Sequence, residues 1–433
     1  MLTKIKRAVS PLILDFRGSC LRIRFKERIM SLPKRLFSRL LTPPPPLMWH
    51  FKDGLPYVEW RGGTKTWRSL PKVALKQLSW WLVRPLLIHW LRKIHQQSRP
   101  IDAPPAPPPL PRRLALAACW LNSFRPYEVR LWQSLGITTW DSLSQKIPES
   151  HCGVAHAARR AHWPDQCNPA GAVLSNKAAL LELADPAWRS PFLTLDRIAP
   201  PEPPDWWHQA LTGPGLVLKP LQGNAGRGVV RFRFDGEQLL TEALGQAIKE
   251  SKQVTGSAMS ALSPLWLLEH WQQIIASQEN ALAMPFLQQG PSFPTSHPAA
   301  VVRVITEQTM PDAPIRMQIA WLRVPLPTSQ EGLALATLID LQGQVLPWPL
   351  LSLNTEQQQQ QDHWQSLLAK GPIAALERCL ELSIAMHQRL PPIDQVAWEW
   401  IPSEPEVKLI EGNSGFGLMV PQMFMVMQQG YDQ

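Results

Sequence analysis

Charged residues are scarce in this chain, cysteines are few, and the apolar runs are short. Asp, Glu, Lys and Arg together make up only 18% of the 433 residues. The five cysteines are scattered and odd in number, which argues against a disulfide framework and favours a reducing, cytoplasmic setting. They are Cys20, Cys119, Cys152, Cys167 and Cys379.

No segment has the composition of a cleaved signal peptide or of a helix that spans a bilayer. The basic start, "MLTKIKRAVSPLILDF", is interrupted by Pro11 and Asp15, so we expect no cleaved signal peptide. The helical pattern over residues 70–97 contains Lys76 and Arg84, whereas a span needs about 20 apolar residues. A G-x-S-x-G nucleophile signature is also absent from the sequence.

Basic charge is concentrated at the N-terminus, and tryptophan and proline are abundant. Residues 1–100 hold 21 Lys and Arg against 4 Asp and Glu, so the whole excess of +10 lies there. "LPKVALKQLSWWLVRPLLIHWLRKIHQQ" (70–97) predicts a helix kinked at Pro85, rich in Trp and flanked by cations. This composition is typical of a segment lying in a membrane interface, the alternative being a core helix with a basic solvent face.

We therefore expect residues 1–97 to contact an anionic membrane surface. The expected location is cytoplasmic, with peripheral attachment to the inner face of the membrane. Nucleic acid is not expected as a partner, because prolines and a Trp-rich helix suit a lipid surface better.

Composition divides the chain into four parts. They are a basic Trp-rich region (1–99), a proline-rich linker (100–113), a helical lead-in (114–175) and a main domain (176–430). Mixed strands and helices in the main domain predict an α+β or α/β fold. Strands are expected at "PLWLLEHW", "AAVVRVITEQT", "IRMQIAWLRV", "LALATLIDLQGQVLP", "QVAWEWIP" and "EVKLIEGNSGFG", a hairpin at Asp53-Gly54, and helices at 176–185, near 236–251 and at 363–390.

A glycine-rich turn joins two strands in "GLVLKPLQGNAGRGVVRFRF" (215–234). Gly223, Gly226 and Gly228 follow Lys219 at the end of the first strand. Such a turn can fold over phosphates, because glycine lets backbone N–H groups approach and lets φ be positive. The alternative is an ordinary hairpin with a flexible tip.

Oxygen ligands gather near the end of the chain. Glu411 and Asn413 in "LIEGN" are two apart on a strand, so both side chains project from one face. Glu399 in "AWEW" offers a third oxygen ligand on the preceding strand. Such a set suits Mg²⁺, which takes oxygen ligands and leaves positions for phosphates and water. A salt-bridged edge pair is the alternative.

Taken in order, these motifs resemble an ATP-grasp domain. They are "SNKAALLELA", "VLKPLQGNAGRGVV", "LLEHW", "VVRVIT", "AWEW" and "LIEGNSGFG", over about residues 170–425. They look most like the sugar-transfer-associated branch found beside polysaccharide-biosynthesis genes. The resemblance implies two α+β subdomains that clamp ATP, preceded here by the basic Trp-rich region.

The resemblance also implies roles for individual residues. Lys177 and Lys219 would contact the ATP phosphates, Gly223, Gly226 and Gly228 would cover them, and Glu269 would lie at the hinge against adenine. Arg303 would stabilise charge on the acyl-phosphate side, and Glu399, Glu411 and Asn413 would hold Mg²⁺. The family usually has aspartate where Glu399 stands, and its Asp-Asn…Gly-Gly segment is reduced here to "TSQEG".

The implied activity is ATP-dependent ligation. A carboxylate of a small-molecule or glycan substrate would become an acyl phosphate for attack by an amine, in cell-surface polysaccharide biosynthesis. Phosphoryl transfer to a glycan, and a non-catalytic nucleotide-binding adaptor at the membrane, are the alternatives.

A histidine- and cysteine-rich stretch lies outside this scheme. "HCGVAHAARRAHWPDQC" (151–167) lacks the tight paired spacing of zinc sites, so we interpret it as a surface helix and loop.

Overall fold

The computed structural model describes four strands in the first sixty residues, position 82, and, with gaps, residues 118–431. The larger gaps are 223–227, 245–252, 256–262, 294–298, 326–333 and 347–372, the last with four described positions. Most of segment 70–97, for which membrane contact is expected, therefore lies outside the described residues, as do the linker 100–113 and "TSQEG".

Two antiparallel hairpins precede the main domain. One pairs β1 (Ile13–Phe16) with β2 (Leu21–Arg24), and the other pairs β3 (Leu47–Lys52) with β4 (Leu55–Trp60). Lys52 lies opposite Leu55, so the two strands pair up to both sides of the predicted turn, whose two residues lie outside the described part of the chain. The predicted hairpin is confirmed.

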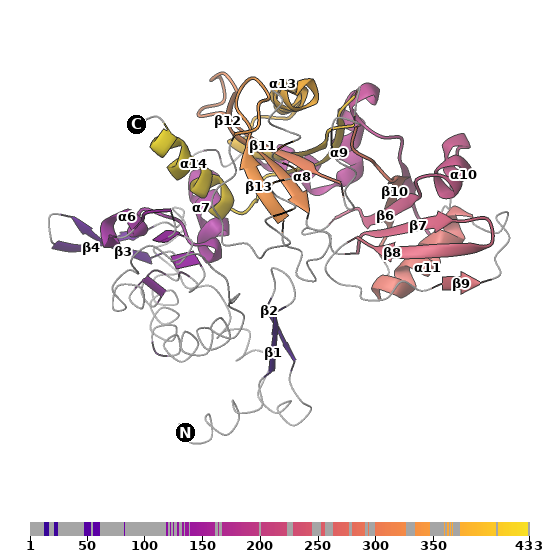
Figure 1. Ribbon diagram of the computed structural model, residues 1–433, viewed down its shortest axis with the longest axis horizontal. Coiled ribbons are helices and arrows are strands. Elements are labelled where there is room, and N and C mark those ends of the chain that lie inside the picture. Colours follow the sequence, from indigo (N-terminus) through magenta and orange to yellow (C-terminus); the bar gives the residue numbers. More distant parts are fainter. Residues whose placement is uncertain are drawn as a thin grey trace.

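A six-stranded antiparallel sheet forms one half of the main domain, at the right of Figure 1. Its order is β5-β10-β6-β7-β8-β9, with β5 (Leu193–Leu195), β6 (Leu216–Pro220), β7 (Val230–Phe234), β8 (Gln238–Ala243), β9 (Gln253–Thr255) and β10 (Ala281–Pro285). Helices α10 (Asp205–Thr212) and α11 (Pro264–Ile275) pack on one face, where Leu216 and Leu218 meet Trp207 and Trp271. Because side chains alternate along a strand, Val217 and Lys219 project from the other face.

A five-stranded antiparallel sheet forms the other half. Its order is β13-β12-β11-β14-β15, with β11 (Val301–Glu307), β12 (Arg316–Pro325), β13 (Ala334–Leu338), β14 (Gln395–Ile401) and β15 (Lys408–Asn413). Helix α13 (Ala374–Arg389) covers the face that carries Val302, Val304 and Trp398. All five strands were predicted from the sequence, and α13 falls inside the predicted helix 363–390.

Further helical segments lie beside the two sheets and beside the β3–β4 hairpin (Figure 1). They are α6 (Trp140–Ser144), η2 (Glu149–His151), α7 (Cys152–Arg160), α8 (Cys167–Ser175), α9 (Lys177–Leu183), η3 (Pro186–Trp188) and α14 (Met419–Tyr431). Helix α9 begins as predicted, since the Asn176 side chain accepts hydrogen bonds from the N–H groups of Ala178 and Ala179.

Two predicted elements are wrong. "PLWLLEHW" forms helix α11, because Ser263 caps its start, Pro264 is its first residue, and Leu267, Leu268 and Trp271 recur at helical spacing. The helix predicted near 236–251 begins instead as strand β8. Here Asp235 accepts hydrogen bonds from the N–H groups at 237 and 238, and this tight turn returns the chain as a strand beside β7.

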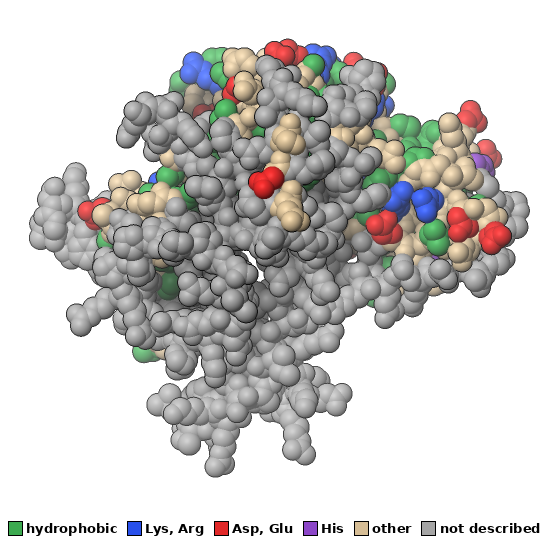
Figure 2. Space-filling model, in the orientation of Figure 1, with side chains coloured by type: hydrophobic (Ala, Val, Ile, Leu, Met, Phe, Trp, Pro, Cys, Tyr) green, Lys and Arg blue, Asp and Glu red, His purple; other side chains and the backbone are tan. Residues whose placement is uncertain are grey.

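None of the helices in the described part of the chain is long and apolar enough to cross a membrane. On the face shown in Figure 2, described cationic and anionic side chains lie interspersed around the six-stranded sheet. That mixture agrees with the mildly acidic composition of the chain after residue 100.

Candidate functional site

A row of charged side chains crosses three strands of the five-stranded sheet. Arg303 on β11 lies opposite Glu399 on β14, and Glu399 lies opposite Glu411 on β15. Residues directly opposite one another in antiparallel strands share a face, so all three project to the side away from α13. Val302 and Trp398, which precede Arg303 and Glu399 on their strands, are fully buried on the α13 side.

Glu399 is the most perturbed member of this row. Its Oε1 lies 2.5 Å from Arg303 Nη2, and its side chain is only 14% exposed. Burial raises the pKa of Glu399 to about 7, Glu411 raises that pKa further, and Arg303 and Arg323 oppose the shift. Two carboxylates therefore face each other, and both burial and the neighbouring Glu411 disfavour the ionised form of Glu399.

Glu411 and Asn413 share one face of β15, as the sequence predicts. Asn413 Nδ2 donates a hydrogen bond to Glu411 Oε1 at 2.8 Å. The glycine between them is required by packing: a Cβ at Gly412 would lie 2.8 Å from the Trp398 ring and 3.0 Å from Leu174 on α8. The spacing in "EGN" thus sets two oxygen-bearing side chains on one face and close packing on the other.

Lys219 reaches this row from the six-stranded sheet. The register shifts between Glu399 and Trp400, which leaves Ile410 without a partner on β14. The Ile410 carbonyl accepts a hydrogen bond from Lys219 Nζ at 3.3 Å. Burial lowers the pKa of Lys219 to about 8, Glu411 opposes that shift, and Lys177 adds to it.

Lys177 brings a second cation to the same place. It is the first residue of α9, and its backbone N–H donates to the Leu221 carbonyl just beyond β6. Burial lowers the pKa of Lys177, while Glu411 and Glu399 oppose the shift. The structure therefore brings together two buried lysines and two carboxylates from parts of the chain more than 150 residues apart.

The strand-to-strand nature of the glycine loop is confirmed, because β6 and β7 pair directly with Leu218 opposite Val230. Gly223 and Gly226 lie outside the described residues. Gly228 has φ +73°, and a Cβ there would lie 3.2 Å from the Pro220 ring. This glycine is therefore explained by packing, and a phosphate contact at the loop stays a prediction.

Glu269 is not beside Lys219. It lies on α11, which covers the Leu218 face of the sheet, whereas Lys219 projects from the opposite face. Its carboxylate lies 3.6 Å from Arg197 Nη2, and its side chain is 46% exposed. The predicted strand at this position is helix α11, and the contact of Glu269 with adenine, which the family resemblance implies, stays a prediction.

Two features of the site were missed in the sequence. One is a buried apolar cluster made by Val217, Met284 and Phe286 on the Lys219 side of the sheet, with Phe192 packed against it. The other is Arg323, which lies opposite Val301 and so shares the face of Arg303. Burial lowers the pKa of Arg323, Arg303 adds to the shift and Glu399 opposes it. The sequence does contain a signal for the cluster. "GLVLK" and "ALAMPF" have the length of a strand and carry apolar residues on both faces, which indicates that both faces of the sheet are buried there.

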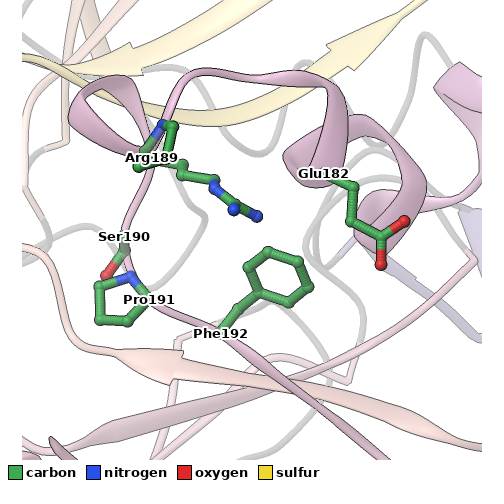
Figure 3. Close-up of a pocket in the computed structure, with 6 residues that line it drawn as sticks. Glu182, Arg189, Ser190, Pro191 and Phe192 are labelled. Carbon is green, nitrogen blue, oxygen red and sulfur yellow. The ribbon is translucent and has the colours of Figure 1, made fainter.

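A cavity of about 540 Å³ lies nearby at the segment that follows α9 (Figure 3). The Arg189 guanidinium stands 5.1 Å from the centre of the Phe192 ring, and Phe192 also borders the apolar cluster. The lining residues are Glu182, Pro186, Arg189, Ser190, Pro191 and Phe192. This cavity thus adjoins the site through Phe192 and contains none of the charged row.

The donor set fits Mg²⁺ better than a soft metal. No group of three or more His, Cys, Asp or Glu side chains gathers at a metal-binding distance in the part of the chain that is described. The interpretation of 151–167 as a surface segment is wrong in part, because His151, Cys152 and His156 are buried. Glu399 and Glu411 face each other at the polar row, and a divalent cation would relieve the repulsion between them.

Similarity of this chain to known proteins is confined to solved structures. No family model and no curated protein sequence matches it. Among solved structures, D-alanine–D-alanine ligase from Bacillus anthracis complexed with ATP aligns at 10% identity and a TM-score of 0.35, over 60% of this chain and 62% of that one. The chain therefore spans under two thirds of that ligase's length.

Two further solved structures are similar at the same level. VanG D-Ala:D-Ser ligase from Enterococcus faecalis aligns at 11% identity and a TM-score of 0.32, over 58% of this chain and 55% of that one. N5-carboxyaminoimidazole synthase from Aspergillus clavatus, in complex with ADP and 5-aminoimidazole ribonucleotide, aligns at 10% identity and a TM-score of 0.30. The alignment covers 57% of this chain and 45% of that one. These neighbours are ATP-grasp ligases. Superposition at this level is loose, so the function proposed below rests on the side chains of the site.

Proposed function

We propose that this chain is an ATP-dependent ligase of the ATP-grasp type, which joins a carboxylate to an amine. The observation that supports it is the meeting of Lys177 and Lys219 with Glu399 and Glu411 between two antiparallel sheets. Lysine side chains bind the phosphates of a nucleotide triphosphate, and carboxylates that face each other bind the Mg²⁺ that accompanies it. The site offers both kinds of group side by side.

In the proposed complex, Lys177 and Lys219 face the phosphates of ATP. The apolar cluster of Val217, Met284 and Phe286, on the same side of the sheet as Lys219, takes the nucleotide base. Glu411 and Asn413, with Glu399, would hold Mg²⁺, which neutralises phosphate charge during transfer.

The reaction then proceeds in two steps. A carboxylate oxygen attacks the γ-phosphorus, the bond to the β–γ bridging oxygen breaks, and ADP leaves with its electron pair. An amine nitrogen next attacks the acyl carbon, the C–O bond to phosphate breaks, and an amide, inorganic phosphate and a proton result. Arg303, on the same face as the carboxylates, stabilises negative charge that develops at the acyl group.

Two other uses of the same site are phosphoryl transfer to a glycan hydroxyl and nucleotide binding without turnover. Neither has an observation of its own in the described residues, since the shortened "TSQEG" loop lies outside them. The finer assignments are a glycan or small-molecule substrate in polysaccharide biosynthesis, and peripheral attachment through residues 1–97. Both rest on the sequence resemblance and on the composition of that region.

Product analysis tests the proposal. Full-length protein is incubated with MgATP, a panel of carboxylates such as amino acids and uronic acids, and hydroxylamine as a surrogate amine. A ligase produces ADP and a hydroxamate, whereas a kinase produces ADP and a phosphorylated glycan. Failure of the protein to bind MgATP at all, measured by calorimetry, would refute the proposed function.

A further inference from the structure

Helix α7 carries a strip of three polar side chains that contact the backbone just after Asn413. Cys152, His156 and Arg160 are spaced by four residues each, so they lie on one face of the helix. Their backbone partners are residues 418, 416 and 414, in that order. We call Cys152, His156 and Arg160 the α7 strip and residues 414–418 the Asn413 loop.

The two segments run in opposite directions. Successive members of the α7 strip are one helical turn apart, about 6 Å along the axis. Their backbone partners are two residues apart and follow in reverse chain order. The loop therefore runs antiparallel to the helix, and each turn of α7 meets every second residue of the loop.

The two buried members of the strip make neutral contacts. His156 Nε2 lies 2.8 Å from the Phe416 carbonyl, and its ring packs edge-on against the Phe416 ring with centroids 4.7 Å apart. Burial lowers the pKa of His156, so its Nε2 carries the proton that the carbonyl accepts. Cys152 accepts a hydrogen bond from the Leu418 N–H at 3.2 Å, and burial raises the pKa of this thiol to about 11.

Arg160 links the loop to the sheet. Its Nη2 donates to the Ser414 carbonyl, and its Nε lies 3.3 Å from Asp394 Oδ1. Asp394 is 2% exposed and immediately precedes β14, the strand that carries Glu399. One guanidinium therefore joins the start of β14 to the end of β15.

Side-chain packing holds only part of the Asn413 loop. The Phe416 ring is buried in an apolar cluster, and Leu418 packs against the same cluster. A Cβ at Gly415 or at Gly417 would meet nothing within 4 Å, so packing does not restrain the backbone at these two glycines, which have the largest conformational freedom to lose. The α7 strip adds a restraint on the backbone itself, through the Ser414 and Phe416 carbonyls and the Leu418 N–H.

We propose that His156, Arg160 and Cys152 are positioning residues, which fix the Asn413 loop and thereby the side chain of Asn413 at the polar row. This role rests on the proposed function, because it needs Asn413 to act on the metal–nucleotide complex. It also explains the His- and Cys-containing motif without a metal, since the spacing of four is that of a helix face.

Four variants of the full-length protein test the role. His156→Leu removes the donor at similar size, and His156→Gln keeps an amide N–H in place of Nε2. Arg160→Met removes the guanidinium, and Arg159→Met is the matched control, because Arg159 is exposed on the same helix. Each variant is examined by chymotryptic cleavage after Phe416 without nucleotide, and by ATP affinity with and without Mg²⁺.

We expect His156→Leu and Arg160→Met to raise native-state cleavage after Phe416 about tenfold, the factor that loss of one buried hydrogen bond gives. The ratio of ATP affinity with Mg²⁺ to that without should fall about fivefold or more in both variants. His156→Gln should restore both values toward the wild type, and Arg159→Met should change neither.

Cleavage and ATP affinity test separate parts of the proposal. Unchanged cleavage in His156→Leu and Arg160→Met would overturn the restraint itself, whatever the nucleotide does. Raised cleavage with an unchanged Mg²⁺ ratio would overturn the positioning role and leave a purely structural contact. A wild-type protein that does not bind MgATP would refute the proposed function and with it this role, while cleavage would still decide whether the α7 strip holds the loop.

Discussion

Replacing Glu399 with glutamine should make the protein more stable at pH 8 and at the same time remove its activity. The carboxylate is nearly buried, and its pKa is about 7 against an ordinary value of 4.5. The folded state therefore binds more protons than the unfolded state between these values. The contribution of Glu399 to the free energy of unfolding is therefore fully present below pH 4.5 and is lost as the pH rises through about 7.

The magnitude follows from that difference in pKa. At about 1.4 kcal/mol per pKa unit, ionised Glu399 costs the folded protein up to about 3 kcal/mol at pH 8. Glutamine keeps the shape without the charge, so Glu399→Gln avoids this cost. For a domain of this size the midpoint of thermal unfolding should rise by several degrees at pH 8 and change little at pH 4.5.

Thermal unfolding at both pH values and MgATP turnover are measured on one sample. Turnover should fall about 100-fold or more, because an oxygen ligand and its charge are lost where phosphate charge must be neutralised. Glu406→Gln is the control, since Glu406 is 57% exposed beside Lys408 and should change neither value appreciably. A Glu399→Gln variant that is less stable at pH 8, with turnover kept, would refute the metal assignment and favour a structural salt bridge with Arg303.

Three further predictions follow from the site and the N-terminal region. ATP binding near pH 8.5 should take up protons, because phosphates favour the charged form of Lys219, whose pKa in the free protein is about 8; calorimetry in two buffers should detect this uptake, and Lys219→Met should abolish it. Gly228→Val should lower the midpoint of thermal unfolding, since φ at Gly228 is +73° and a Cβ there would lie 3.2 Å from the Pro220 ring, whereas Gly226→Val should only weaken ATP binding. Equal unfolding midpoints for Gly228→Val and the wild type would contradict the packing explanation of Gly228. Deleting residues 1–97 should end sedimentation with anionic vesicles at low salt while ATP affinity is kept, and equal sedimentation of both proteins would exclude a lipid contact there.

The five-stranded sheet could be predicted from the sequence because its strands carry their own local signals. "VVRVIT", "AWEW" and "LIEGN" are short runs with apolar residues on both faces, and each is interrupted by one charged residue of the row. Predicting Glu411 and Asn413 on one face needed only the period of a strand. The apolar run of α11 is too short for its period to distinguish a helix from a strand, and only the Ser263–Pro264 start signal favours the helix.

The meeting of the two sheets could not be predicted in this way, because it depends on contacts across long stretches of chain. Lys219 and Ile410 are 191 residues apart, and their hydrogen bond depends on a register shift in β15 that no local pattern announces. The α7 strip is a similar case. His156 and Phe416 are 260 residues apart. The spacing of four between Cys152 and His156 is not that of a zinc motif but that of successive turns of α7, which face a glycine-containing loop. In both places a polar side chain binds a main-chain carbonyl. Every residue has such a carbonyl, so the sequence does not mark which one is bound. Side-chain motifs can therefore nominate Lys219, Glu411 and Asn413, whereas the groups that hold these residues in position become visible only in the fold.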